Sequence, residues 1–166
     1  MKLAERKKLV WNFTFGVEDS LVSTVGLVSG IAAGGMAVDA ILMTGLVLVC
    51  VEAFSMGVGS FLSDQSAEES EKHKEVSSAK SVPGAAVMFV SYLLSGMIPL
   101  VPYTIFAVNE AMLISIGLTV LSLFVLGVYN GWRASVHPAK EGLKMVFFGA
   151  FAIAAGIGVG RLFRLG

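Results

Sequence analysis

The sequence predicts an all-α integral membrane protein with five transmembrane helices, and its composition and charge distribution are the main evidence. Of the 166 residues, 55% are hydrophobic and only 14% are charged, whereas soluble domains carry about 25% charged residues. The charged residues cluster in a few short stretches, separated by apolar tracts long enough to cross a bilayer at about 20 residues each. The single Cys50 excludes an internal disulfide framework. A net charge of zero argues against nucleic acid as a partner.

The whole chain, residues 1–166, is expected to form one five-helix membrane domain. A short polar turn around Asp39 separates the first two apolar segments, which predicts a tight helical hairpin. Residues 64–81 form a short acidic connection, and Glu68 precedes Lys72 by four residues, so we expect the second helix to continue into water. The predicted spans are approximately 14–37, 40–62, 82–106, 111–131 and 144–163.

Two later segments contain residues that interrupt helices. The third span includes GMIPLVP, residues 96–102, where proline frees backbone carbonyls and kinks a membrane helix. After the fourth span, the sequence NGWRASVHPAKEG is predicted to form a loop, because Pro138 and Gly142 disfavour helical structure.

Small residues recur at a spacing of four in the first span, at Gly26, Gly30 and Gly34. In water this helix would be weak, because each buried Gly costs about 1 kcal/mol relative to Ala. In a membrane the same pattern lets two helix backbones approach closely. The last span carries small residues too, including Gly156 and Gly160, so both spans are expected to pack closely.

The Lys and Arg residues of the short loops predict the orientation of the chain. Ten of them lie in the N-terminal segment and in the loops 64–80 and 133–144, and none lies in the two loops on the opposite side. This distribution places the N-terminus in the cytoplasm. The C-terminus then lies on the other side, where Arg161 and Arg164 run against the rule.

Two carboxylates in the apolar tracts are the main candidates for a functional site. Asp19 follows Glu18 at the cytoplasmic mouth of the first span, with Ser23 one turn deeper. Glu52 lies near the middle of the second span. An unpaired ionised carboxylate there would cost about 2.5–3.5 kcal/mol, so Glu52 must be protonated, paired, or in contact with a cation or water.

The second span also carries a polar stripe that includes Glu52. Met56 lies four residues beyond Glu52 on the same helix face, and Ser60 and Ser63 extend the stripe toward the cytoplasm. Carboxylate and hydroxyl oxygens suit divalent cations, and a thioether adds a soft ligand. Together with Asp19, this donor set indicates a first-row metal ion such as Fe²⁺ or Mn²⁺. A buried carboxyl group can also exchange protons.

Plainer interpretations of these residues stay open. Asp19 could be a helix N-terminal acid stabilised by the helix dipole. Met56 could fill space between helices, and the acidic stretch 64–75 could be a solvated helix face. The sequence contains no nucleophile–base arrangement, nucleotide-binding loop or paired Cys/His motif, so we do not expect an enzyme.

Motifs in four of the five spans resemble those of the vacuolar iron transporter family, which includes nodulin-like proteins. GVEDSLVSTVGLVSG resembles the family motif G-x-x-D-G-L-V-[ST]-T of the first helix. EAFSMGVGSFLS resembles the second-helix motif A-L-S-M-x-x-G-E-Y-x-S. SGMIPLVPY is similar to G-x-x-x-P-L-x-P-[YF] of the third helix, and FVLGVYNGWRASVHP is similar to the end of the fourth. The resemblance covers nearly the whole chain.

The resemblance implies a homodimer of five-helix protomers that exports Fe²⁺, and often Mn²⁺, from the cytoplasm in exchange for protons, through a path at the two-fold interface. By position, Asp19 matches the metal-path Asp of the first helix and Met56 matches the Met of the second. Ser20 replaces the family Gly after the Asp, and Ser60 replaces the Glu of G-E-Y-x-S. Glu52 occupies a usually small position, so we hypothesise that a carboxylate has moved within the path, from the position of Ser60 to that of Glu52.

A second departure concerns the connection 64–81, which has about 18 residues. Iron-storing members of the family carry a long Glu-rich metal-binding region at this place. The connection is too short for such a separate domain, which leaves metal binding by the loop and the identity of the substrate open.

The expected function is therefore proton-coupled metal export, with Fe²⁺ or Mn²⁺ as transported substrate and no permanently bound cofactor. The expected partners are metal ions, protons, membrane lipid and a second copy of the chain. The membrane would be the plasma or inner membrane of a prokaryote or a vacuole-like membrane of a eukaryote. The expected path residues are Asp19, Glu52 and Met56, with Glu18, Ser23, Ser60 and Ser63 as weaker candidates.

Two alternatives from other functional classes stay open. One is a transporter or channel for another cation or a small solute on the same scaffold. The other is a non-transporting membrane scaffold subunit, in which Asp19 and Glu52 would tolerate substitution.

Overall fold

The computed structural model describes residues 3–75 and 77–164, which form long α-helices and two short 3-10 turns without any β-strand. Five helical regions are long and apolar enough to cross a membrane, which confirms the predicted all-α, multi-pass architecture. In chain order the elements are α1 (Leu3–Ala33), α2 (Val38–Lys72), η1 (Ser78–Lys80), α3 (Val82–Leu100), η2 (Val101–Thr104), α4 (Val108–Arg133) and α5 (Pro138–Arg164).

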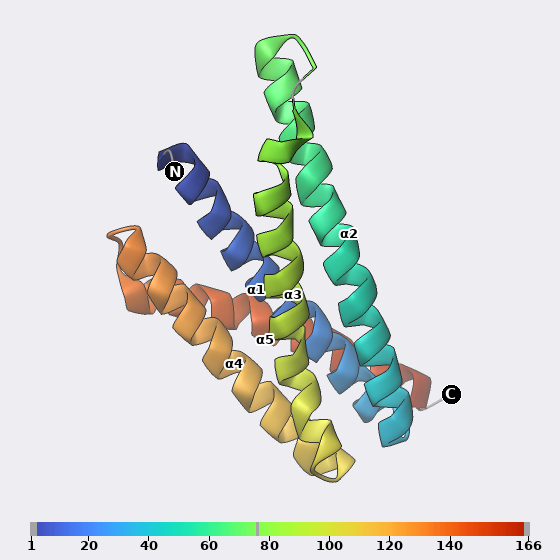
Figure 1. The fold of residues 1–166 in the computed structure, drawn as a ribbon. Coiled ribbons are helices and arrows are strands. Elements are labelled where there is room, and N and C mark those ends of the chain that lie inside the picture. The colour runs from blue at the N-terminus through green and yellow to red at the C-terminus, as the bar shows by residue number, and fades with distance from the viewer. Residues whose placement is uncertain (1–2, 76, 165–166) are drawn as a thin grey trace.

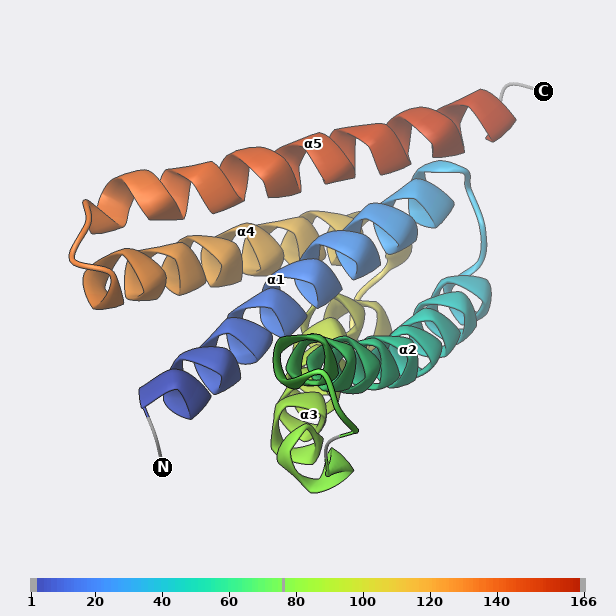
Figure 2. The ribbon, with the colours of Figure 1, turned by 90° about the horizontal axis from the view of Figure 1, so that it is seen from above.

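Helix α1 is the central element of the fold. It packs most extensively against α3 and α5, while α4 packs against α5 and α2 packs against α3. Seen from above, α1 runs between the α4–α5 pair and the α2–α3 pair (Figures 1 and 2). Its side chains Leu21, Val25 and Val28 are fully buried. The helix that carries Asp19 is therefore held by neighbours on both sides.

The glycines of α1 pack against the backbone of α5. A Cβ atom on Gly30 would lie 2.6 Å from the carbonyl oxygen of Gly156, and Cβ atoms on Gly156 and Gly160 would collide with the carbonyl oxygens of Gly26 and Gly30. Only glycine permits such an approach. The predicted close packing of the first and last spans is confirmed, and the structure adds that each is the other's partner.

The predicted tight hairpin between the first two spans is wrong in its packing. The turn is short, and Gly35 adopts a φ of 83° in it. However, α2 packs mainly against α3 and contacts α1 much less. The side-chain contacts between α1 and α2, Lys8 with Asp64 and Asn12 with Ser60, lie at the end away from the turn. The physical reason is that the small-residue face of α1 is already covered by α5.

Helix α2 extends well beyond a bilayer, as predicted. Its 35 residues span about 52 Å at 1.5 Å per residue, against about 30 Å of hydrocarbon. The charged end projects past the other helices (Figure 1), and the expected ion pair between Lys72 and Glu68 forms there. Lys8 Nζ lies 2.7 Å from Asp64 Oδ2. The start of α1 and the end of α2 therefore lie at the same end of the molecule.

The interruption of the third span is local. Helix α3 continues through Pro99 to Leu100 and then tightens into η2. Pro102 has no N–H, so it cannot donate the three-residue 3-10 bond to the carbonyl of Pro99. The hydroxyl of Ser115 in α4 donates to that carbonyl instead, at 2.7 Å.

The loop predicted between the fourth and fifth spans is wrong over most of its length, because only residues 134–137 lie outside helices. Pro138 is the first residue of α5, a position that suits its fixed φ and missing N–H. Gly142 lies inside α5, where a Cβ atom would come within 2.8 Å of the ring of Phe124. Pro138 therefore begins a helix and Gly142 allows close helix packing, so neither residue forms a loop.

Candidate functional site

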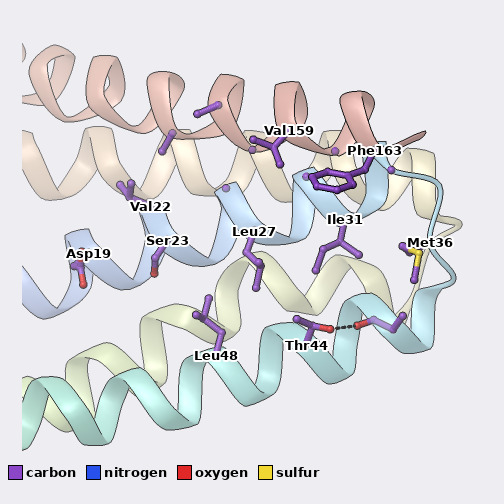
Figure 3. Close-up of a pocket in the computed structure, with 18 residues that line it drawn as sticks. Asp19, Val22, Ser23, Leu27, Ile31, Met36, Thr44, Leu48, Val159 and Phe163 are labelled. Carbon is purple, nitrogen blue, oxygen red and sulfur yellow. Dashed lines mark hydrogen bonds between the residues drawn. The ribbon is translucent and has the colours of Figure 1, made fainter. Parts of the chain in front are cut away.

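An open groove of about 870 Å³ runs along α1, between α2 and α5 (Figure 3). Most of its lining is apolar or small, including Leu27, Leu48 and Val159. Asp19 and Ser23 lie toward one end of the groove, and Phe163 lies toward the other (Figure 3). The negative charge of the groove is therefore concentrated at the end that Asp19 occupies.

Asp19 and Ser23 reach the groove because they lie four residues apart on one face of α1. Both are half-buried, whereas Ser20 and Thr24, one position further along, are fully buried. The predicted grouping of Asp19 with Ser23 is thus present in the structure.

Glu52 on α2 is paired with Tyr92 on α3. The phenolic hydroxyl of Tyr92 donates a hydrogen bond of 2.7 Å to Glu52 Oε2. The hydroxyl of Ser23 lies 2.8 Å from the same phenolic oxygen. A phenol has one proton and an ionised carboxylate can only accept, so Ser23 donates to Tyr92 and Tyr92 donates to Glu52. This chain of hydrogen bonds joins α1, α3 and α2.

The carboxylates on α1 and α2 are close enough to influence each other. The charges of Asp19 and Glu52 repel, as do those of Glu18 and Asp19. Closely spaced negative charges in an apolar surrounding attract a cation. Within residues 3–75 and 77–164, however, no three His, Cys, Asp or Glu side chains gather into one metal-binding group. A metal ion held by these carboxylates would therefore need additional ligands of another kind, such as thioethers, hydroxyls or water.

The remaining candidates are only partly brought to this site. Met56 is half-buried one turn beyond Glu52 on α2, and neither of the two lines the groove itself. Ser60 accepts a hydrogen bond of 3.1 Å from the side-chain amide of Asn12 on α1. Ser63 is exposed. The predicted stripe on α2 therefore divides into two parts. Glu52 is hydrogen-bonded to Tyr92, whereas Ser60 is hydrogen-bonded to the start of α1.

Sequence reasoning missed two residues of this region, Tyr92 and Asn12, which are 0% and 2% exposed. A signal for Tyr92 exists in the sequence, because Ser91, Tyr92 and Ser95 place polar groups on neighbouring faces of an otherwise apolar helix. Such a polar cluster in a membrane helix marks contacts with other helices.

Comparison with known proteins assigns the family. The model of the VIT family matches residues 10–83 and 71–161. This chain belongs to the VIT family. Vacuolar iron transporter 1 of Eucalyptus grandis is 22% identical over 214 residues, covering 93% of this chain and 86% of that protein. An uncharacterized protein of Methanocaldococcus jannaschii is 27% identical over 157 residues, covering 84% of this chain and 81% of that protein.

A third relative, vacuolar iron transporter cccA of Arthroderma benhamiae, is 35% identical over 88 residues, which are 46% of this chain and 31% of that protein. The two parts of the family match overlap at residues 71–83, the connection between α2 and α3. The alignment with the Eucalyptus protein is longer than this whole chain, so that protein contains residues without a counterpart here.

Proposed function

We propose that this VIT-family protein exports Fe²⁺ or Mn²⁺ from the cytoplasm in exchange for protons, as a homodimer with the ion path at its two-fold interface. The observation that carries the proposal is the hydrogen-bonded connection between two carboxylate-bearing membrane helices, in which Ser23, on the same groove face of α1 as Asp19, is joined through Tyr92 to Glu52 on α2. Placing charge inside a bilayer is costly and marks ion pathways. Several relatives are named as vacuolar iron transporters, which supports a metal ion as the cargo.

The proposed ligands are Asp19, Glu52 and Met56, which offer carboxylate oxygens and a thioether sulfur. This donor set suits borderline first-row ions. Glu18, next to Asp19, would attract the ion at the entrance. Since the groove beside Asp19 is open, a second copy of the chain would complete its wall and add a second set of ligands.

The exchange of metal for protons follows from the chemistry of the same carboxylates. A metal ion that binds a carboxyl group competes with the proton on it, so metal binding releases protons. Each metal ion that binds from the cytoplasm would therefore displace protons into the cytoplasm, and the carboxylates would take up new protons from the other side once the metal has left there.

The proposed direction of transport uses the distribution of basic residues. Lys8 at the start of α1 pairs with Asp64 near the end of α2, and Lys72 and Lys80 lie near the same end, around Glu68. Basic residues accumulate on the cytoplasmic side. Asp19 would thus lie in the cytoplasmic half of α1 and receive the ion first.

The test is uptake of Fe²⁺ and Mn²⁺ into proteoliposomes that contain a pH-sensitive dye. We expect metal entry with counter-flow of protons in the wild type and its loss in Asp19→Asn. Asp39→Asn is the matched control, because it removes the same charge at an exposed position in the first turn of α2, and it should transport normally.

Two other outcomes decide between the alternatives. Flux of a different cation or a small solute, with neither Fe²⁺ nor Mn²⁺ moving, would support another substrate on this scaffold. Folded protein that moves nothing in a selectivity panel would support a scaffold role. Either outcome would overturn the proposed export of metal.

A further inference from the structure

We propose that Tyr92 is a positioning residue of the path, which holds the carboxylate of Glu52 on the side of α2 that faces Asp19. The inference rests on the proposed function, because it concerns the same ion path. It assigns a role to a residue of α3, whereas the ligands expected from the sequence lie on α1 and α2.

The side chain of Tyr92 has little freedom to move. It is fully buried, and its hydroxyl is engaged on both sides, by Ser23 at 2.8 Å and by Glu52 at 2.7 Å. With its proton given to Glu52 and its oxygen accepting from Ser23, the phenol has little capacity left for a metal ion. Its geometry suits the orientation of a ligand better than ligation itself.

The backbone of Tyr92 is fixed at the same place. Its carbonyl accepts hydrogen bonds from Ser20 Oγ at 2.6 Å and from Ser95 Oγ at 3.3 Å. One turn further, a Cβ atom on Gly96 would lie 2.6 Å from both Ser20 Oγ and Val49 Cγ2. Helices α1, α2 and α3 therefore pack closely together beside Tyr92.

Both unusual polar residues of the first two helices meet at Tyr92. Ser20 stands where the resembled first-helix motif has Gly, and it binds the backbone carbonyl of Tyr92. Glu52 stands where the second-helix motif has a small residue, and it binds the phenol. The two departures thus form one structural unit, in which Ser20 and Ser23 hold Tyr92 and Tyr92 holds Glu52.

The need for such a unit follows from the many rotamers open to a glutamate side chain. Its side chain is long, and α2 packs mainly on α3 rather than on α1. Without the phenolic hydroxyl, the carboxylate would sample several rotamers, and ordering it around an ion would cost conformational entropy. With the hydroxyl present, the hydrogen bond already orders the carboxylate, so part of this entropy cost is not added to ion binding.

The test measures Mn²⁺ binding to purified full-length protein, from the EPR signal of free Mn²⁺, together with the kinetics of Mn²⁺ uptake. Tyr92→Phe should weaken binding about three- to twentyfold, the range of one interhelical hydrogen bond in a membrane. KM should rise by the same factor, with a much smaller change in the maximal rate. A general packing defect would lower the maximal rate instead.

Tyr103→Phe is the matched control. Tyr103 is 2% exposed, and within the described residues its hydroxyl forms no well-aligned hydrogen bond, although Ser29 lies nearby. Its substitution should leave Mn²⁺ binding unchanged. If the wild type binds Mn²⁺ and both substitutions, Tyr92→Phe and Tyr103→Phe, change that binding equally, the positioning role alone would be overturned. A wild type that binds no Mn²⁺ or Fe²⁺ would overturn the proposed function, and the positioning role with it.

A double-mutant cycle identifies the group through which Tyr92 acts. Glu52→Ala removes the acceptor, so adding Tyr92→Phe to it should cause no further loss of binding. An equal loss in both backgrounds would show that Tyr92 acts elsewhere and would contradict the proposal. The comparison of Tyr92→Phe with Tyr103→Phe decides the question even where Glu52→Ala binds Mn²⁺ too weakly to measure.

Discussion

At the scale of single residues, Glu52 lies in an apolar helix with one identified hydrogen-bond donor. An unpaired carboxylate at this depth costs about 2.5–3.5 kcal/mol, and an interhelical hydrogen bond returns about 0.6–1.7 kcal/mol. The bond from Tyr92 therefore offsets only part of the cost. A bound cation, as in the proposed function, would offset the remainder.

Removal of this carboxylate is expected to impair transport. Glu52→Ala should slow the initial rate of Mn²⁺ uptake at least about tenfold, because a lost charged ligand is worth about 1.4 kcal/mol or more. The control is Glu110→Ala, since Glu110 is exposed in the first turn of α4. Normal uptake by Glu52→Ala would sink the hypothesis that a carboxylate has moved from the position of Ser60 to that of Glu52.

Sequence reasoning identified Asp19 and Glu52 because charges in apolar tracts are visible without a structure. It predicted that Glu52 needs a partner, and the structure supplies one. Tyr92 could not be identified in this way, since the role of a phenol depends on which helices lie beside it. The same holds for Asn12, whose partner Ser60 is 48 residues away.

At the scale of elements, α1 and α5 contact each other largely through backbone atoms at their glycines. The glycine stripes of both helices face each other, so side chains contribute little to this part of the interface. Packing in a membrane depends on such close approach, because burial from water does not drive it. The interface should therefore be unusually sensitive to a single added methyl group.

Gly156→Ala is expected to destabilise the protein by about 1–3 kcal/mol, the usual cost of overpacking, because its Cβ would collide with the carbonyl of Gly26. The measurement is thermal unfolding of the detergent-solubilised protein. Gly158→Ala is the control on the same helix, since a Cβ there meets nothing within 4 Å, and it should be neutral or slightly stabilising. Equal effects of the two substitutions would contradict this account of the interface.

The elements themselves were largely predictable, and their partners were not. Apolar tracts predicted the five spans, and the spacing of Glu68 and Lys72 predicted the helical extension of α2. The expected loop around Pro138 failed because proline fits the first turn of a helix as well as a loop. The expected tight packing of the first two spans failed because α5 covers the glycine face of α1, so α2 packs mainly against α3.

At the scale of the whole molecule, the groove along α1 lacks a wall on one side. The groove beside Asp19 is bounded by α1, α2 and α5 and is otherwise open (Figure 3). Its existence could not be predicted from the sequence, because it depends on how far apart α1 and α2 lie after the short turn that joins them. A second copy of the chain is the proposed occupant.

Bulk introduced into the groove should therefore prevent dimerisation. Ala155 lines the groove on α5, and Ala155→Trp is expected to convert the dimer into a folded monomer, as measured by native mass spectrometry from detergent. Leu113→Trp is the control, because Leu113 is 68% exposed on α4 and does not line the groove. A dimer that survives Ala155→Trp would place the interface on another face.

The openness of this groove also bears on the lipid around the protein. An apolar recess of about 870 Å³ that faces hydrocarbon does not stay empty, since any apolar chain nearby gains dispersion attraction by lying against its walls. In a bilayer a single protomer would carry acyl chains in this recess. Association of two protomers would then be an exchange reaction that expels these chains, and its equilibrium would depend on the length and saturation of the surrounding lipids.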